Sequence, residues 1–579
     1  MINLIKKNLN GQARLFAIIA PIMMLVEVFM DLQQPAMMAN IIDIGVANRD
    51  LNYILHTGLL MILFAGIGFI GGASCSIFAS LAGVRMSSEL RQKLFVKIQS
   101  LSFFELDQFK TSSLITRLTN DVSQIQTMLL MMLRIMVRSP LLVLGGIVMA
   151  YLLSPTLSIL FCIILPIIVA SIILVLNGSV PLFTQVQKRL DRVNTVMREN
   201  LLGVRVVKSF TMEDNQFKRF NQVNDDLTDH NIKAQNVTFL LMPIVTLVMN
   251  FSVVFILWFG GNMVISQNFE IGKIMAFINY LIQITNSLVM AVNLVINISR
   301  AQASAARINE VFAVDPAIRE PQNPQIPKNF DIEFNNVNFR YGHSGDPVLK
   351  NLSFKIREGE SVGIIGATGA GKSSLVNLIP RLYDVTSGQV LLGNVDVRQL
   401  NLDELRRKIG VVMQESILFG GTIGSNLHFG NEHASNADLN QASADAQALG
   451  FIGSLPQTFD SLVEQRGRNF SGGQKQRISI ARTLLKDPRI LILDDSTSAV
   501  DLKTESNLRS ALAERMHGRT VIMIAQRISA VMDADKILVL EHGEIAAIGN
   551  HTELLKTSEI YRSIVVSQLG EEALAHVNA

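Results

Sequence analysis

The sequence predicts two fused parts: a six-helix α-helical transmembrane domain with long cytoplasmic helical extensions, followed by an α/β domain of the P-loop type. Three observations support this prediction. Apolar segments long enough to cross a bilayer, about 20 residues each, recur through the first half of the chain and then stop. Short β-rich runs alternate with helical stretches in the second half. A glycine-rich loop at residues 366–374 lies directly between a buried strand and a helix.

The composition agrees with a large membrane part. Of the 579 residues, 49% are hydrophobic and only 17% are charged, whereas a soluble domain carries about 25% charged residues. The net charge of +3 is small, and we expect no nucleic acid among the partners. Cys75 and Cys162 lie in separate apolar runs, so we expect two buried, reduced thiols.

We expect the transmembrane domain to cover residues 1–320 and to contain six spans. Basic residues are concentrated in the two long loops after the second and fourth spans, while the three short loops on the other side carry essentially Arg49 alone. The positive-inside rule therefore places both termini and both long loops in the cytoplasm, with the spans in the lipid of the cytoplasmic membrane. The spans are approximately residues 15–38, 59–81, 136–153, 157–176, 239–264 and 271–296.

Both long loops are prone to form helices, because they hold little glycine or proline. As a pair of antiparallel helices, each loop would extend roughly 30 Å into the cytoplasm at 1.5 Å per residue. Residues 111–121 and 198–210 lie at the expected tips, and taken alone they are ordinary amphipathic turns.

Polar residues inside the spans are candidates for lining a path through the membrane. In the last span, four amide side chains share one helical face, so they either line a wet path or hydrogen-bond to neighbouring helices. In the first span, Glu27 and Asp31 lie four residues apart on one face. They could attract a lipophilic cation, pair within the protein, or lie near the membrane interface. The four amides are Asn279, Gln283, Asn286 and Asn293.

A proline-rich linker separates the two parts. Hydropathy falls after residue 300, and Pro316, Pro321, Pro324 and Pro327 follow within a short stretch. We expect the second domain at residues 329–579.

The glycine-rich loop has the G-x-x-x-x-G-K-[ST] pattern in its required context. Its glycines let the backbone wrap closely around a phosphate, and its N–H groups point at the anion. Lys372 is expected to reach the β- and γ-phosphates of a nucleoside triphosphate, and the Ser373 hydroxyl to ligate Mg²⁺. The cofactor-binding residues expected in this loop are Gly366, Thr368, Gly369, Ala370, Gly371, Lys372, Ser373 and Ser374.

Further features of the second domain stand in a fixed order around this loop. Tyr341 lies 25 residues before it, where an aromatic ring could stack on a nucleobase. The others are Gln414 after a β-rich run, Ser471, Gly472, Gly473 and Gln474 at the start of a helix, Asp494 and Asp495 at the end of a buried strand, Asp501 beyond it, and Gln526 after a later strand.

Together these features resemble the ATP-binding cassette (ABC) exporters, half-transporter class, over nearly the whole chain. A serine-glycine-glycine-glutamine signature between the two nucleotide motifs is highly specific to that family. The resemblance implies Mg²⁺ ligation by Ser373, Asp494 and Gln414, adenine stacking by Tyr341, ATP contact by the signature Ser471–Gln474 and by Asp501, and docking on the nucleotide domains by segments 111–121 and 198–210.

Two positions depart from the family pattern. The family places Glu directly after the Mg²⁺ aspartate, to orient the attacking water, and this chain has Asp495, which is one methylene shorter. A misplacement of about 1 Å can lower the rate about a hundredfold. The family also places a switch His where this chain has Gln526, which does not titrate. Asp495 and Gln526, with Gln414, are the catalytic positions, and the two departures predict ATP binding with weak hydrolysis.

The resemblance then implies an ABC-type ATPase that exports lipophilic, multidrug-type compounds as one half of an asymmetric heterodimer. A different half-transporter with Glu and His intact would supply the competent site, which this chain's signature would complete. The alternatives are a homodimer that hydrolyses slowly, an exporter of lipid or peptide, and an ATP-sensing membrane regulator that transports nothing.

Overall fold

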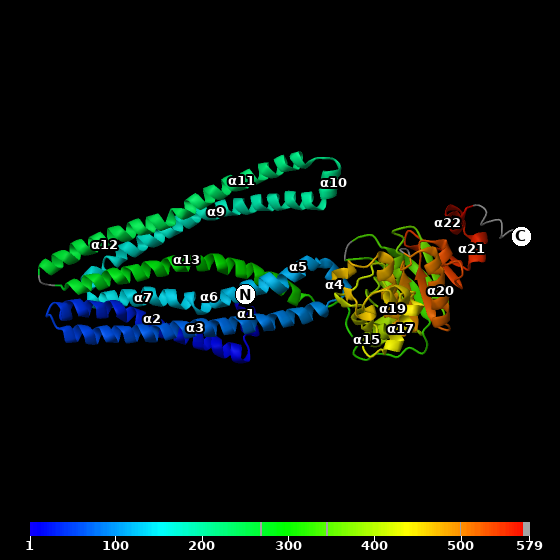
Figure 1. The fold of residues 1–579 in the computed structure, drawn as a ribbon, viewed down its shortest axis with the longest axis horizontal. Coiled ribbons are helices and arrows are strands. Elements are labelled where there is room, and N and C mark those ends of the chain that lie inside the picture. Colours follow the sequence, from blue (N-terminus) through cyan, green and yellow to red (C-terminus); the bar gives the residue numbers. More distant parts are fainter. Residues whose placement is uncertain (267–268, 343–344, 498–499, 571–579) are drawn as a thin grey trace. The chain divides into compact units, whose positions relative to one another are not determined.

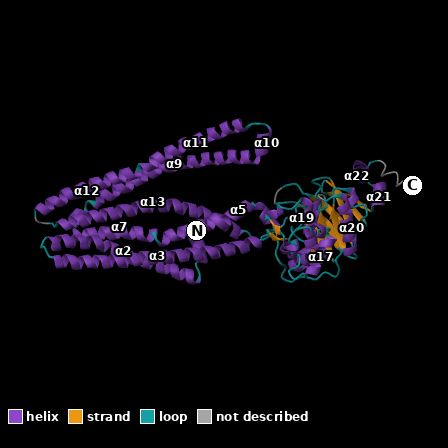
Figure 2. Ribbon diagram, viewed as in Figure 1, coloured by secondary structure: helices purple, strands orange, loops and turns teal. Residues whose placement is uncertain are grey.

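The computed structural model describes residues 1–266, 269–342, 345–497 and 500–570, without the side chains of residues 292, 293, 295, 296 and 502. Contacts within the chain define two compact units. The first consists of Met1–Gln99 and Thr111–Val314, and the second of Ser100–Lys110 and the chain from Asp315 onward. Figure 2 shows the strands gathered in the second unit, whereas the first unit is helical.

The first unit is a bundle of long helices (Figure 1). Among the described residues, six helical segments are long and apolar enough to span a membrane, which confirms the predicted number of spans. The short π-helical turns at Ile41–Val46 and Arg117–Asp121 continue two of them. The helices are α1 (Ile2–Asn8), α2 (Gly11–Asn40), α3 (Leu51–Gln99), α5 (Thr111–Thr116), α6 (Val122–Leu133), α7 (Ile135–Leu153), α8 (Pro155–Ser158), α9 (Phe161–Leu202), α10 (Val204–Ser209), α11 (Glu213–Phe239), α12 (Leu241–Ile265) and α13 (Ile271–Ala313).

The distribution of apolar side chains in this bundle fits a surface that faces lipid. Large apolar side chains point outward, as Phe69 and Leu174 do with 76% and 73% of their surface exposed. The interior is filled by Phe277 and Tyr280 of α13, both fully buried. Cys75 is buried as expected, but Cys162 is exposed, because α9 is apolar on the outward face too.

The second long loop forms the predicted pair of antiparallel helices. Figure 1 shows α9 and α11 side by side, joined at their ends by α10. Residues 198–210 therefore lie at a tip, and no residue of α10 is buried within the unit.

The second unit contains two main sheets. One is antiparallel with strand order β2-β1-β4-β5, and the other has the order β12-β11-β3-β10-β9-β6, of which all but β12 are parallel. Strands β7 and β8 form a small separate pair. The strands are β1 (Ile332–Phe339), β2 (Leu349–Ile356), β3 (Ser361–Gly366), β4 (Ser387–Leu392), β5 (Val395–Asp396), β6 (Ile409–Val412), β7 (Gly421–Thr422), β8 (Leu462–Val463), β9 (Ile490–Asp494), β10 (Thr520–Ile524), β11 (Lys536–Glu541) and β12 (Glu544–Gly549).

Helices cover the parallel sheet, as expected for buried strands that read as continuous apolar runs. All five residues of β9 are buried, for example. The helices of this unit are α4 (Phe103–Gln108), α14 (Lys372–Leu378), α15 (Leu402–Lys408), α16 (Ile423–His428), α17 (Asn436–Asp445), α18 (Leu449–Gly453), α19 (Gly472–Leu485), α20 (Leu502–Arg515), α21 (His551–Thr557) and α22 (Glu559–Leu569).

The division of the chain differs in one respect from the predicted domains of residues 1–320 and 329–579. Helix α4 comes from the first long loop but packs in the second unit. Its buried Glu105 accepts hydrogen bonds from the Ser102 backbone N–H at 2.8 Å and from the Ala317 N–H at 3.0 Å. The α/β unit is therefore assembled from two separate stretches of the chain.

Candidate functional site

The carboxyl ends of the parallel strands bring most of the predicted nucleotide residues together. The phosphate loop follows β3, Asp494 ends β9, and Gln526 and Gln414 follow β10 and β6. This edge of a parallel sheet is where α/β proteins bind ligands. A cleft of about 250 Å³ opens there, lined by Val348, Thr368, Gly369, Gly371, Lys372, Ser373, Ser374, Gln414, Asp494, Asp495, Ile524 and Gln526.

The phosphate loop has the conformation that its glycines predict. Gly371, which caps α14, has a φ of +96°, and a Cβ at this position would lie 2.7 Å from a side-chain carbon of Leu349. The Lys372 ammonium donates hydrogen bonds to the carbonyls of Gly366 and Ala367 at 2.8 and 2.9 Å. Burial lowers the pKa of Lys372, while the carboxylates of Asp495 and Asp494 oppose this shift. The loop thus presents a positive charge and free N–H groups to an anion.

Two of the predicted Mg²⁺ ligands lie in contact. The Ser373 hydroxyl donates to Asp494 Oδ1 at 3.0 Å, and the amide of Gln414 lines the same cleft. Burial raises the pKa of Asp494, against the hydrogen bond from Ser373, and the Asp495 charge raises it further. Hard oxygen donors beside a phosphate site are the ligands that Mg²⁺ prefers, so the residues fit the ion.

Asp495 is held by both amide side chains that the sequence marked as catalytic positions. Its Oδ2 accepts a hydrogen bond from Gln526 Nε2 at 2.7 Å and another from Gln414 Nε2 at 3.4 Å. Burial raises the pKa of Asp495, and these two hydrogen bonds oppose the shift. The backbone of Asp495 has a φ of +46°, so the side chain leaves the strand end in a fixed direction.

Tyr341 lies beside the cleft. Its hydroxyl is 2.9 Å from the Ser374 hydroxyl, and its ring meets the ring of Tyr383 edge-on, with centroids 5.2 Å apart. The ring is 42% exposed, which leaves a face available for stacking.

The signature lies apart from this cleft. Ser471 caps the 14-residue helix α19: its hydroxyl accepts from the Gln474 N–H at 3.3 Å, and its own N–H donates to Gln474 Oε1 at 2.9 Å. Asp501 caps α20 by accepting from the Thr504 N–H at 3.0 Å. Ser471, Gly472, Gly473, Gln474 and Asp501 are absent from the cleft lining, and Ala370 is buried within the loop.

Sequence reasoning missed the contacts of α4 with the nucleotide domain. The Tyr383 hydroxyl donates to Asp107 Oδ2 at 2.7 Å, and its ring lies 6.0 Å from that of Phe103. Burial raises the pKa of Tyr383, and the hydrogen bond to Asp107 raises it further. Helix α4 belongs to the α/β unit, whereas Thr111 onward belongs to the first unit, and the docking role predicted for residues 111–121 stays a prediction. The Ser102–Glu105 capping box was the available signal.

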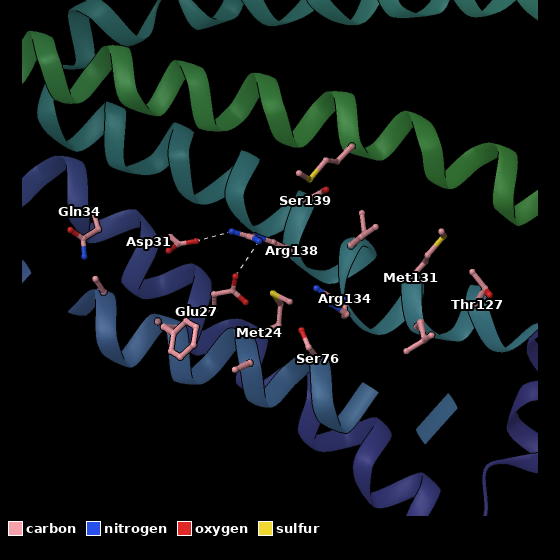
Figure 3. Close-up of a pocket in the computed structure, with 18 residues that line it drawn as sticks. Met24, Glu27, Asp31, Gln34, Ser76, Thr127, Met131, Arg134, Arg138 and Ser139 are labelled. Carbon is pink, nitrogen blue, oxygen red and sulfur yellow. Dashed lines mark hydrogen bonds and ion pairs between the residues drawn. The ribbon is translucent and has the colours of Figure 1, made fainter. Parts of the chain in front are cut away.

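The membrane unit contains a cavity of about 830 Å³ (Figure 3). Glu27 and Asp31 line it, but both pair with Arg138, at 3.1 and 3.0 Å. Of the three possibilities left open for these two carboxylates, pairing within the protein is the one observed. Asn279, Gln283 and Asn286 of α13 are not among the described lining residues. Asn279 donates to the Met275 carbonyl at 3.0 Å, Gln283 Oε1 is buried, and Asn286 is exposed. The side chain of Asn293 lies outside the described residues.

Comparisons with known proteins agree with both units. The model of the ABC transporter transmembrane region matches residues 17–288, and the ABC transporter model matches residues 349–498. The chain is 41% identical, over 96% of its length, to the uncharacterized ABC transporter ATP-binding protein YfiB of Bacillus subtilis, of which it covers 97%. It is 34% identical, over 85% of its length, to the ATP-dependent lipid A-core flippase of Syntrophus aciditrophicus, of which it covers 82%.

A solved structure shares the whole architecture. The structure of a bacterial Atm1-family ABC exporter with ATP bound aligns with a TM-score of 0.79 at 27% identity, over 96% of this chain and 99% of that one. Membership of one family therefore explains the membrane spans, the phosphate loop and the predicted Mg²⁺ ligands together. The chain belongs to the ABC transporter family and is an exporter whose multi-pass membrane domain is fused to a cytoplasmic domain that binds ATP with Mg²⁺.

Proposed function

We propose that this exporter works as one half of an asymmetric heterodimer and carries lipophilic, multidrug-type compounds out of the cell. Its own nucleotide site binds ATP and hydrolyses it slowly, and its signature completes the competent site of a different half-transporter. The observation that carries this proposal is the pair of residues at the reaction centre, Asp495 and Gln526, which hydrogen-bond to each other.

The geometry of this pair supports slow hydrolysis. The Asp495 carboxylate is drawn toward the Gln526 amide at 2.7 Å, and it is one methylene shorter than the glutamate that the family uses. The binding half of the site is complete, since Lys372, Ser373 and Asp494 are all in place.

The signature supports the role toward a partner. Helix α19 begins at Gly472 with an intact capping box, so its first N–H groups remain directed at whatever anion lies beyond Ser471. In a head-to-tail arrangement of two cassettes, that anion is the γ-phosphate bound by the partner subunit. A chain with a weak catalytic position and a complete signature is most useful beside a chain with a strong catalytic position.

Motion is proposed to pass between the domains through two segments. Helix α4 contacts the nucleotide domain through Asp107 and Tyr383, and Tyr383 in turn contacts Tyr341, which we propose stacks on adenine. The second segment, 198–210, presents the exposed helix α10. ATP binding would close the cassettes and shift the spans from inward- to outward-facing, and hydrolysis at the partner's site would reset them.

A second candidate is export of a lipid by a homodimer. The relative from Syntrophus aciditrophicus is named as a lipid A-core flippase, and this chain is 34% identical to it. The cavity among the spans, with its largely apolar walls, would admit a lipid as well as a drug.

The ATPase rate separates these candidates. We expect little turnover from this chain alone and brisk turnover when it is purified with a half-transporter that has Glu and His at the two positions. Ser471→Arg in this chain should abolish that brisk turnover. Ser435→Arg is the matched control, because Ser435 caps α17 with a similar capping box outside the signature. Brisk turnover by the chain alone, without a partner, would establish the homodimer instead.

A further inference from the structure

The cavity of about 830 Å³ in the membrane unit is built from four stretches of helix. Helix α2 contributes Met24, Glu27, Asp31 and Gln34, and α3 contributes Phe69 and small residues such as Gly72. The opposite wall comes from the junction of α6 and α7, with Met290 of α13. Its walls are mostly apolar, and its size suits an amphiphile of drug or lipid-tail dimensions.

One arginine pairs with both acidic side chains of the cavity, and a second, Arg134, balances the remaining negative charge. Arg138 forms an ion pair through Nη1 with Glu27 Oε1 at 3.1 Å, and its Nη2 donates a hydrogen bond to Asp31 Oδ2 at 3.0 Å. Figure 3 shows its guanidinium between the two carboxylates. Helix α3 approaches Glu27 so closely that a Cβ on Gly72 would lie 2.7 Å from the carboxylate. A lipophilic cation could bind here only by displacing Arg138, which would leave a guanidinium unpaired among apolar walls.

Arg134 is different. It lies one helical turn before Arg138, at the junction of α6 and α7, and lines the same cavity near Ser76 and Met24 (Figure 3). Within the described part of the chain, its guanidinium has no hydrogen bond or ion pair. Its charge acts on the Glu27 carboxylate through space, but its N–H donors remain for a ligand. Arg134 lies just before the third span, at the cytoplasmic end where basic residues are expected, and it lines the cavity.

We propose that this cavity binds the anionic headgroup of an amphiphile at Arg134, with the hydrocarbon tail against the apolar walls. The ligand class is a carboxylate, phosphate or sulfonate joined to a long apolar chain, either a free amphiphile or a membrane lipid. This names the cargo class of the exporter proposed above and rests on that function. It replaces the lipophilic cation that Glu27 and Asp31 first indicated, because Arg138 occupies both carboxylates.

Three probes that differ only in their headgroup test the charge preference. They are 11-(dansylamino)undecanoic acid, its methyl ester and the corresponding primary amine, and they are titrated into the full chain in phosphatidylcholine nanodiscs without ATP. We expect the carboxylate to bind best. Arg134→Gln should weaken its binding roughly tenfold or more, since a hydrogen bond to a charged group is lost, and should leave the ester unchanged. Arg134→Lys should retain most of the affinity.

The matched control is Arg14→Gln, which removes an exposed arginine from α2 outside the cavity and should change nothing. Equal weakening of all three probes by Arg134→Gln, or no weakening, would overturn the proposal. Nanodiscs doped with phosphatidylglycerol distinguish the two sources of the anion. If the lipid competes with the carboxylate in the wild type but not in Arg134→Gln, the site takes a lipid headgroup; without competition it takes a free amphiphile.

Asp31→Asn gives an independent test, because an anion site and a cation site predict different changes in probe affinity for this variant. Removing this carboxylate frees one side of the Arg138 guanidinium, so affinity for the carboxylate probe should rise several-fold and affinity for the amine should not fall. Tighter binding of the amine in the wild type, lost in Asp31→Asn, would instead identify a cation site. Because the assay uses neither ATP nor a partner, its failure is distinguishable from failure of the heterodimer proposal.

Discussion

Lengthening the Asp495 side chain should restore hydrolysis at this chain's own site. The carboxylate accepts hydrogen bonds from Gln526 at 2.7 Å and from Gln414 at 3.4 Å. These two hydrogen bonds keep the carboxylate close to the ends of the strands. Asp495→Glu adds one carbon–carbon bond, about 1.5 Å of reach. Since a misplacement of about 1 Å can cost about a hundredfold, the expected gain is about tenfold to a hundredfold, or roughly 1.4 to 2.7 kcal/mol in the barrier. Gln526→His in addition should increase it further.

The assay is a single-turnover measurement of ATP hydrolysis in the heterodimer whose partner subunit carries Gln in place of its catalytic Glu. Only the site of this chain is then counted. Asp438→Glu is the matched control, because it makes the same change in the exposed capping box of α17. The reasoning is refuted if the wild-type site already turns over as fast as Asp495→Glu with Gln526→His, or if neither variant exceeds the control.

Four further outcomes are expected. Tyr383→Phe keeps the ring but removes the hydrogen bond to Asp107. This should weaken the packing of α4 by about 1–2 kcal/mol and speed up hydrogen exchange in α4 by about tenfold. Unchanged exchange would contradict this. Burial raises the pKa of Asp494, so Mg²⁺-dependent nucleotide affinity, measured by calorimetry, should fall with decreasing pH before an ordinary aspartate titrates. Asp495→Asn removes a charge that raises this pKa and should move that loss to lower pH. Gly371→Ala should abolish ATP binding, measured by equilibrium dialysis, because its φ is +96° and a Cβ meets a neighbouring side chain.

The parts of the structure that sequence reasoning predicted are those encoded by local patterns. Spans are recognised by apolar length alone, so six were found, although helices such as α3 continue well beyond the lipid-spanning stretch. The phosphate loop is one continuous motif with its own strand and helix, so the order of β3 and α14 followed directly.

The parts that were missed depend on contacts between distant residues. The pairing of Arg138 with Glu27 and Asp31 joins separate helices, and nothing in either segment alone shows that they meet. The docking of α4 through Asp107 depends on Tyr383, which lies 276 residues later. The docking role of residues 111–121 was inferred from the family resemblance and stays a prediction. The asymmetric dimer remains a prediction, resting on Asp495 and Gln526.

The ATP-binding unit is built from two stretches of chain that are synthesised at different times. Ser100–Lys110 leaves the ribosome early, whereas Ala317, to which Glu105 is bonded, follows 212 residues later. All the remaining spans are made in the interval. Contacts between such distant residues form late, since the intervening loop must close first. Completion of the ATP-binding unit thus waits for the membrane part of the same molecule: α4, the first helix of that unit to be synthesised, gains its partners only after the remaining spans have been made.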